Sequence, residues 1–283
     1  MKVYTMSDEK TDSSSSSQSL TAAAQVAKDL MELAKNDDNT KVASKNFGES
    51  AVIISKTVKN CLLPLAAINF GIDKAKLYFE KNFKKDLEEK TQSIPAENIV
   101  EPKASIAGPA LQGLAFCHEE VNLKEMYLNL VSSAMNSDKA EDTHPAFVEI
   151  IKQLTSLEAH LLRLYLNDSA PKGIGRVLYQ KQGTIGYIVG YTHILPISSN
   201  TQPYYNKNIP SYIENWIRLG LIEVKYDLHL DGHEEAYNAL KERDEYLKDD
   251  LGLGTEYPKI LGKGLMKRTP FGAQFADIVG LTN

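Results

Sequence analysis

Apolar residues recur at three- and four-residue steps through the first half of the chain, which predicts amphipathic helices. The clearest stripe begins at Leu123 and ends at Ala134. Further stripes lie in segments 19–44, 74–90 and 144–167, and short polar or proline-containing stretches separate them. We therefore expect the first half to be all α-helical with short connections.

Polar residues that suit helix starts support these boundaries. Thr155, with Glu158 three residues later, is predicted to form a capping box. Thr269 and Pro270 are predicted to be the N-cap and first-turn pair of a last helix. The Gly-Pro pair at 108–109 predicts another helix start, with the proline in the first turn.

The pattern changes after Pro171, where glycines punctuate a tract rich in Tyr, Ile and Val. Thr184–Ile197 is predicted to be a strand. Two more strands are predicted at Leu221–Tyr226 and Leu265–Arg268, with a charged helix at about His233–Leu251 between them. This order of helix, strand, strand and helix is typical of a winged-helix unit, here with a helix inserted in its wing.

These elements predict an α+β protein in two parts behind a short tail. Residues 1–18 contain a serine run and bury too little apolar surface to offset their ordering entropy, so we expect a disordered tail. Residues 19–168 are predicted to be a helical domain, and residues 169–283 a smaller α+β domain that is winged-helix-like. A length of 283 residues fits two domains of ordinary size.

The formal net charge of −5 argues against a protein that mainly binds the phosphate backbone of nucleic acids. One tract, Ser169–Ile213, is an exception, since it has four cations and no carboxylate. The cations are Lys172, Arg176, Lys181 and Lys207, and the tyrosines with them are Tyr179, Tyr187, Tyr191, Tyr204, Tyr205 and Tyr212. Cations and aromatic rings are the ingredients of a single-strand groove, although a tyrosine-rich sheet packed on the helices explains the same residues.

Signatures of nucleophilic catalysis and of metal binding are missing, and Cys61 and Cys117 lie among apolar residues, as inert buried thiols do. The weak candidates for a catalytic or metal-dependent role are His118, Glu119, Glu120 and His144. The two glutamates directly precede a helix start, where the helix dipole already favours negative charge. We therefore expect no metal, no cofactor and no small-molecule substrate, and favour a binding protein over an enzyme.

The predicted location is the cytoplasm, because two cysteines suit a reducing compartment and Met1–Lys10 lacks the layout of a secretory signal. The longest uncharged stretch, Cys61–Ile72, is interrupted by Pro64 and is shorter than the roughly 20 residues that span a bilayer. A buried core helix is the simpler prediction. An interfacial membrane helix over Val52–Ile72 stays open as an alternative.

Two runs carry a resemblance to a known family. The sequence LKEMYLNL at 123–130 and the sequence HPAFVEIIKQL at 144–154 resemble the abortive infection alpha (Abi-alpha) family, bacterial proteins built around a domain of unknown function. Weaker matches are IPAENI at 94–99, LGLI at 219–222 and TPFG at 269–272. The resemblance covers about residues 45–280 and implies phage resistance through damage to or arrest of the infected cell. It implies no catalytic residues.

Four functions follow from these observations. The preferred hypothesis is a cytoplasmic bacterial antiviral defence protein of the abortive-infection type that binds a macromolecular partner, either another protein or a second copy of the chain. The alternatives are a nucleic-acid-binding module of winged-helix type, a metal-dependent hydrolase, and a membrane-perturbing effector.

Overall fold

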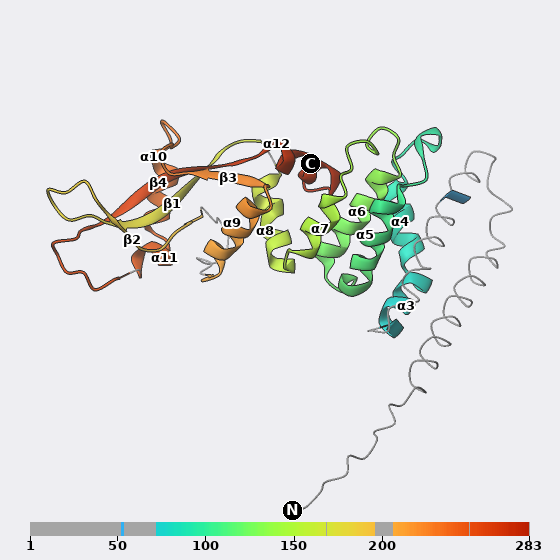
Figure 1. Cartoon of the computed structure of the whole chain (residues 1–283), viewed down its shortest axis with the longest axis horizontal. Helices are drawn as coiled ribbons and strands as arrows, with labels where there is room; N and C mark the ends of the chain where they lie inside the picture. The colour runs from blue at the N-terminus through green and yellow to red at the C-terminus, as the bar shows by residue number, and fades with distance from the viewer. Residues whose placement is uncertain (1–51, 54–71, 168, 196–205, 249, 283) are drawn as a thin grey trace, which may run out of the picture. The chain divides into compact units, whose positions relative to one another are not determined.

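The computed structural model describes residues 52–53, 72–167, 169–195, 206–248 and 250–282 (Figure 1). The predicted tail, the predicted helix at 19–44 and most of the segment 52–72 lie outside these residues. The chain divides into two compact units, residues 1–153 and 154–283. The second unit thus begins before the helix that follows Thr155, whereas the sequence pattern placed the boundary at residue 168.

In the described residues of the first unit, the regular elements are helices, as its hydrophobic stripes predict (Figure 1). Its helices are α3 (Ile72–Lys81), α4 (Phe83–Thr91), the 3-10 helix η2 (Ala96–Asn98), α5 (Ala104–Cys117), α6 (Val121–Ala134) and α7 (Ala146–Lys152). The stripe at 123–134 forms α6, which packs against α4, α5 and α7. Its buried side includes Leu123, Met126 and Leu130. The residues of the predicted stripe therefore form the core-facing side of a central helix.

Helices α5 and α6 approach closely at Gly113. A Cβ atom built on Gly113 would lie 2.4 Å from Cζ of Tyr127, a distance that real Cβ contacts do not show. The Tyr127 ring is buried, so it occupies the space that any larger residue at 113 would need. Glycine at this position therefore sets how near the two helices lie.

The prediction that Pro109 lies in a first helical turn is wrong, because α5 begins at Ala104 and places the proline inside the helix. The backbone N–H groups of Ile106 and Ala107 both donate to the carbonyl of Lys103, so the helix is already formed before Pro109. The bond that proline cannot make would end on the carbonyl of Ser105, near the start of the helix. An interior proline costs less there than in the middle of a long helix.

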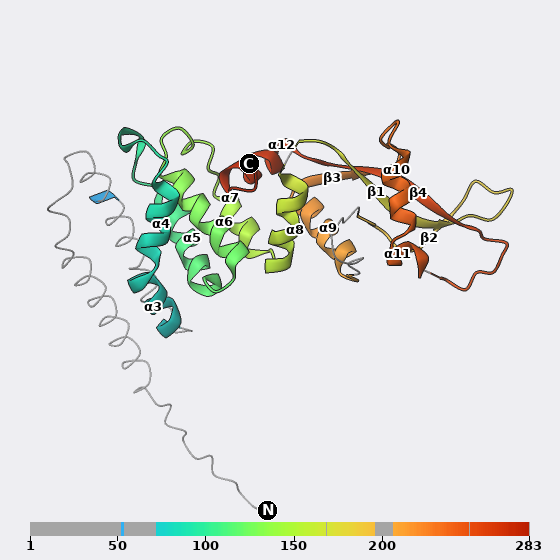
Figure 2. The ribbon, with the colours of Figure 1, turned by 180° about the vertical axis from the view of Figure 1, so that it is seen from behind.

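The second unit is α+β, as predicted, and holds a small curled antiparallel sheet (Figures 1 and 2). Its elements are α8 (Ser156–Leu166), β1 (Lys172–Tyr179), β2 (Ile188–Val189), α9 (Ile209–Arg218), β3 (Ile222–Lys225), α10 (Glu234–Lys241), α11 (Asp244–Leu247), β4 (Lys259–Arg268) and α12 (Pro270–Ile278). The strand order is β2-β1-β4-β3. Both views show β4 running directly into α12.

Two of the strands differ from the prediction because glycines lie inside them. The predicted strand Thr184–Ile197 is a two-residue strand followed by irregular pairing, whereas β1 covers the glycine-rich segment before it. Strand β4 likewise begins six residues before the predicted Leu265 and includes Gly262 and Gly264. Glycine usually weakens a strand, but here it admits large neighbours: a Cβ on Gly264 would lie 2.6 Å from the Tyr226 ring.

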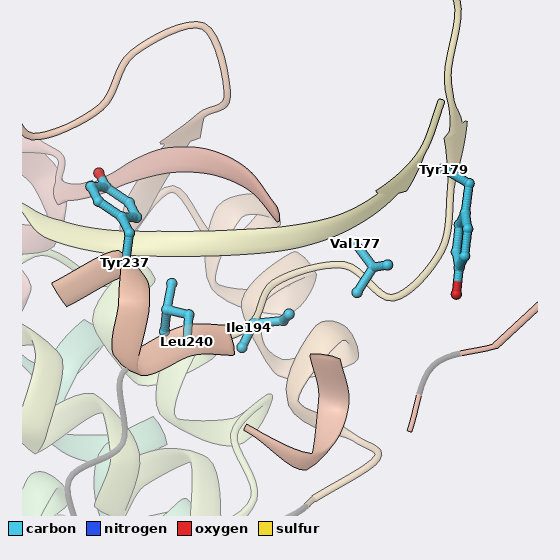
Figure 3. Packing of buried hydrophobic residues seen from close by; sticks show 5 residues of the cluster. All are labelled: Val177, Tyr179, Ile194, Tyr237 and Leu240. Carbon is cyan, nitrogen blue, oxygen red and sulfur yellow. The ribbon is translucent and has the colours of Figure 1, made fainter. Parts of the chain in front are cut away.

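One face of the sheet is covered by α10, which packs on β1. Tyr237 and Leu240 from α10 meet Val177 and Tyr179 from β1, together with Ile194 (Figure 3). Gly173 and Gly175 lie on the same face, where ideal Cβ atoms would come within 3.2 Å of Tyr237 and 3.0 Å of Leu240. Helix α10 therefore lies close to the strand, and we call this side the covered face.

Both predicted helix caps in this unit are confirmed. Thr155 and Glu158 form the full capping box of α8, and the Thr269 side chain accepts a hydrogen bond from the N–H of Gly272. Strands β3 and β4 pair, and the segment between them holds the two short helices α10 and α11 where one helix over about His233–Leu251 was predicted. Strand β1, however, occupies the other edge of β4, so the likeness to a winged helix stays a prediction.

Candidate binding face in the C-terminal unit

The opposite side of the sheet, which we call the arginine face, carries the functional candidates. Alternate residues of a strand share one face, so Ile174, Arg176 and Leu178 of β1 lie together on it. Leu178 is in register with Val189 of β2 and with Ile260 of β4. Val189 and Ile260 are 42% and 38% exposed, so the end of the face near β2 is open to solvent.

Arg176 lies between two tyrosine rings on this face. Its guanidinium carbon is 4.2 Å from the ring centroid of Tyr226 and 5.2 Å from that of Tyr187. Its Nη2 also donates to the Tyr187 hydroxyl at 3.1 Å. Its Nε is shielded from solvent and has no hydrogen-bond partner among the described residues. The guanidinium is thus held flat by cation–π contacts while donors remain for another acceptor.

Two glycines of β4 make room for this arrangement. Gly262 is in register with Arg176, and Gly264 with Ile174. A Cβ on Gly262 would lie 2.9 Å from Cγ of Arg176. The arginine stem and the Tyr226 ring therefore lie directly over the backbone of β4.

A hydrogen-bonded network anchors Tyr226 to the rest of the unit. Its hydroxyl donates to the carbonyl of Gly175 at 3.2 Å and accepts from the backbone N–H of His193 at 3.2 Å. The same hydroxyl lies 3.1 Å from Nδ1 of His193, and Nε2 of that ring lies 2.8 Å from Oε1 of Glu214 on α9. The His193 ring therefore connects the Tyr226 hydroxyl to the Glu214 carboxylate.

His193 occupies an unusual backbone position for a residue that is not glycine. Its φ is +57°, in the left-handed region. Gly175 exchanges backbone hydrogen bonds with Ile194, and Val177 exchanges them with Gly190 and Tyr191, so the segment at 191–193 bulges opposite Arg176. This bulge turns the buried His193 ring onto the arginine face. Strain of this kind is retained where the surrounding contacts determine the conformation.

Burial raises the pKa of the Tyr226 phenol to about 12, and the nearby Arg176 charge opposes that rise. Tyr226 therefore stays neutral at physiological pH and keeps its hydroxyl proton as a donor. Glu214 is mostly exposed, while the His193 side chain is only 7% exposed. The network thus runs from a solvent-facing carboxylate on α9 to a buried phenol under Arg176.

The four predicted cations have different surroundings. Lys172 is half-buried at the first position of β1, on the same face as Arg176. Lys181 pairs with Glu256 at 3.1 Å and lies over the Tyr257 ring. Lys207 is exposed just before α9. Arg176 is therefore the cation that the aromatic rings surround.

The predicted tyrosines that the structure describes also have different surroundings. Tyr179 is buried on the covered face, and the half-buried Tyr191 packs against the same cluster. Tyr204 and Tyr205 lie outside the described residues. Tyr187 lies on the arginine face and is 49% exposed, so it is the tyrosine of the predicted tract that is available there.

Sequence reasoning missed Tyr226, His193 and Glu214 as members of the site. Tyr226 follows β3 and reaches Arg176 through the pairing of β3 with β4 and of β4 with β1. No local motif marks His193, because its position depends on a bulge. The glycines of β4 indicate close neighbours, but the register that brings Tyr226 to Arg176 follows from the pairing of the strands.

The weak catalytic candidates of the first unit have local structural partners. The ring of His118 stacks on Tyr78 with centroids 5.0 Å apart, and Glu119 pairs with Lys74 at 2.9 Å. That lysine lowers the pKa of the exposed Glu119 carboxyl through its hydrogen bond and charge. Glu120 is the N-cap residue of α6.

His144 accepts a hydrogen bond from the N–H of Ala146 at the start of α7, at 3.1 Å. It thereby serves a backbone donor that the helix leaves unsatisfied. Across the described residues, no three His, Cys, Asp or Glu side chains are grouped so that they could hold a metal ion.

Within the described residues, no helix combines the length and the apolar character needed to cross a bilayer.

The fold defines a two-unit α+β protein, with a helical first unit and a small antiparallel sheet in the second. The family model described as abortive infection alpha matches residues 75–279, which is most of the chain. The protein therefore belongs to the abortive infection alpha family, and this membership indicates an abortive-infection-related role. Neither the curated proteins nor the solved structures contain a significant match.

Proposed function

We propose that this protein acts in bacterial phage defence, in the cytoplasm, by binding a macromolecular partner through the open end of the arginine face. The observation that carries the proposal is the exposure of Tyr187, Val189 and Ile260 around Arg176. Aromatic residues and arginine are enriched in the cores of interaction surfaces, from which other charged residues are depleted. Family membership supports the abortive-infection part of the proposal.

The rigidity of this face supports binding as well. Arg176 is sandwiched between two rings, and Tyr226 is held by three hydrogen-bond contacts to Gly175 and His193. Side chains that are already ordered lose little conformational entropy when a partner docks. The face is thus preorganised for an interaction.

The test is phage protection in a sensitive bacterial host that expresses the full chain. We expect the unaltered protein to lower plaquing by at least one phage of a broad panel, and Tyr187→Ala combined with Val189→Ser to abolish that protection. These side chains are exposed, so the fold should persist, and circular dichroism of the purified variant checks this.

Phe116→Ala is the matched control, because Phe116 is an aromatic residue of the first unit that is 59% exposed. It should protect as well as the unaltered chain. Plaquing equal to an empty vector for every phage would overturn the proposed function. Full protection by the Tyr187/Val189 variant would show that the partner binds elsewhere.

A further inference from the structure

We infer that the partner of the arginine face is a single-stranded nucleic acid, which this face holds by base stacking on Tyr187 and a phosphate contact to Arg176. The inference rests on the proposed function, because both place the partner at the open end of this face. It narrows the partner to one chemical class.

The donors of Arg176 indicate an anionic ligand. A guanidinium has five N–H donors, and the described residues supply one acceptor, the Tyr187 hydroxyl. A phosphate oxygen is an acceptor suited to a planar guanidinium.

The neighbours of Arg176 indicate a ligand with flat apolar rings as well. Tyr187, Val189 and Ile260 are uncharged and partly exposed. A carboxylate-rich peptide would match the arginine but would leave this apolar surface uncovered. Single strands provide both features, because unpaired bases stack on aromatic side chains while phosphates meet cations.

The local charge is compatible with a polyanion although the whole chain is acidic. The tract 169–213, which supplies β1, β2 and Tyr187, has no carboxylate. The nearest acidic side chain of the network, Glu214, is engaged by His193. A strand lying along β1 and β2 therefore meets no unpaired acidic residue from this tract.

The geometry favours a single strand over a duplex. A duplex keeps its base faces stacked inside, where Tyr187 cannot reach them. The footprint is small, since one ring and one guanidinium contact about one or two nucleotides. Binding should accordingly be micromolar, with a log–log salt slope of about −0.7 for each phosphate contacted.

The experiment is fluorescence anisotropy of labelled oligonucleotides with the full chain at about 50 mM salt. The probes are oligo-uridine, oligo-adenosine, oligo-thymidine and a duplex of the same length. The assay therefore compares RNA with DNA and single strands with a duplex. We expect saturable binding of one or more single strands and weaker binding of the duplex. Tyr187→Ala should weaken binding roughly 5- to 150-fold, the usual range for losing one stacking partner.

Phe116→Ala is the control, because it removes an exposed aromatic ring from the other unit. It should bind nearly as the unaltered chain does. No anisotropy change at high micromolar protein, equal binding by Tyr187→Ala, or tighter binding of the duplex would each overturn the inference.

The two proposals can fail separately. If the Tyr187/Val189 variant loses phage protection while no strand binds, the inference is overturned, and the proposed function stands with a protein partner. If strands bind at Tyr187 while the unaltered chain protects against no phage, the inference is supported and the proposed function is overturned.

Discussion

The hydroxyl of Tyr226 lies 3.1 Å from Nδ1 of His193 and accepts a hydrogen bond from the backbone N–H of the same residue. It also donates to the carbonyl of Gly175, so one phenol connects the end of β3, the bulge beside β1 and β1 itself. This contact decides where Arg176 can lie, because the guanidinium rests on the Tyr226 ring.

Tyr226→Phe should destabilise the protein by about 1–3 kcal/mol, because it leaves the buried N–H of His193 without its acceptor and removes one of the two hydrogen bonds to the carbonyl of Gly175. The ring under Arg176 remains, so the cation–π contact is kept. Urea unfolding followed by circular dichroism measures the change. Tyr187→Phe is the matched control, since its hydroxyl is exposed, and it should change stability by less than about 0.5 kcal/mol.

The stability difference between the unaltered chain and Tyr226→Phe should also depend on pH. Burial raises the pKa of Tyr226 from 10.0 to about 12, so the unfolded chain loses this proton at lower pH than the folded chain. The stabilisation is complete below about pH 10 and is lost as the pH rises through about 12. The stability difference between the unaltered chain and Tyr226→Phe should therefore narrow over that range in urea unfolding. A constant difference would contradict the raised pKa.

Substitutions at His193 should separate the backbone contribution from the side-chain contribution. His193→Gly and His193→Ala both remove the side-chain contacts to Glu214 and Tyr226, but only alanine must hold a Cβ at φ +57°. We expect His193→Ala to be less stable than His193→Gly by about 1 kcal/mol, the usual cost of a left-handed residue that is not glycine. Equal stability in thermal unfolding would mean that the bulge relaxes.

Gly113→Ala should destabilise the first unit by about 1–3 kcal/mol through overpacking against Tyr127. This outcome opposes helix propensity, which favours alanine over glycine by about 1 kcal/mol. In a double-mutant cycle, Tyr127→Leu should recover part of the loss caused by Gly113→Ala, since the smaller side chain vacates the space. Additive losses would show that the two residues do not compete for it.

Cys117 should be nearly inert towards thiol reagents while the protein is folded. Burial raises its pKa to about 12, and its thiol donates to the carbonyl of Gly113. In a chain carrying Cys61→Ser, the reaction rate at neutral pH should rise more than about 100-fold on adding denaturant, because the thiolate is the reactive form. A native rate equal to the denatured rate would contradict this burial.

Local sequence patterns predicted some features of this fold and not others. The stripe at 123–134 and the caps at Thr155 and Thr269 were predictable, because spacing and capping depend on neighbours within one or two turns. Gly173 and Gly262 lie within strands, where glycine is usually unfavourable. The space that they provide is filled by side chains from other elements, and no local pattern records those neighbours.

The sequence by itself determined the helical first half, the change to β structure after Pro171, the carboxylate-free tract and the family. Only the tertiary structure decided that Arg176 contacts both Tyr187 and Tyr226, because strand register brings Tyr226 to Arg176 and a backbone bulge brings His193 beneath them. Register and bulges follow from contacts between residues distant in sequence. The candidate site is therefore a product of packing, whereas the elements that carry it are a product of local pattern.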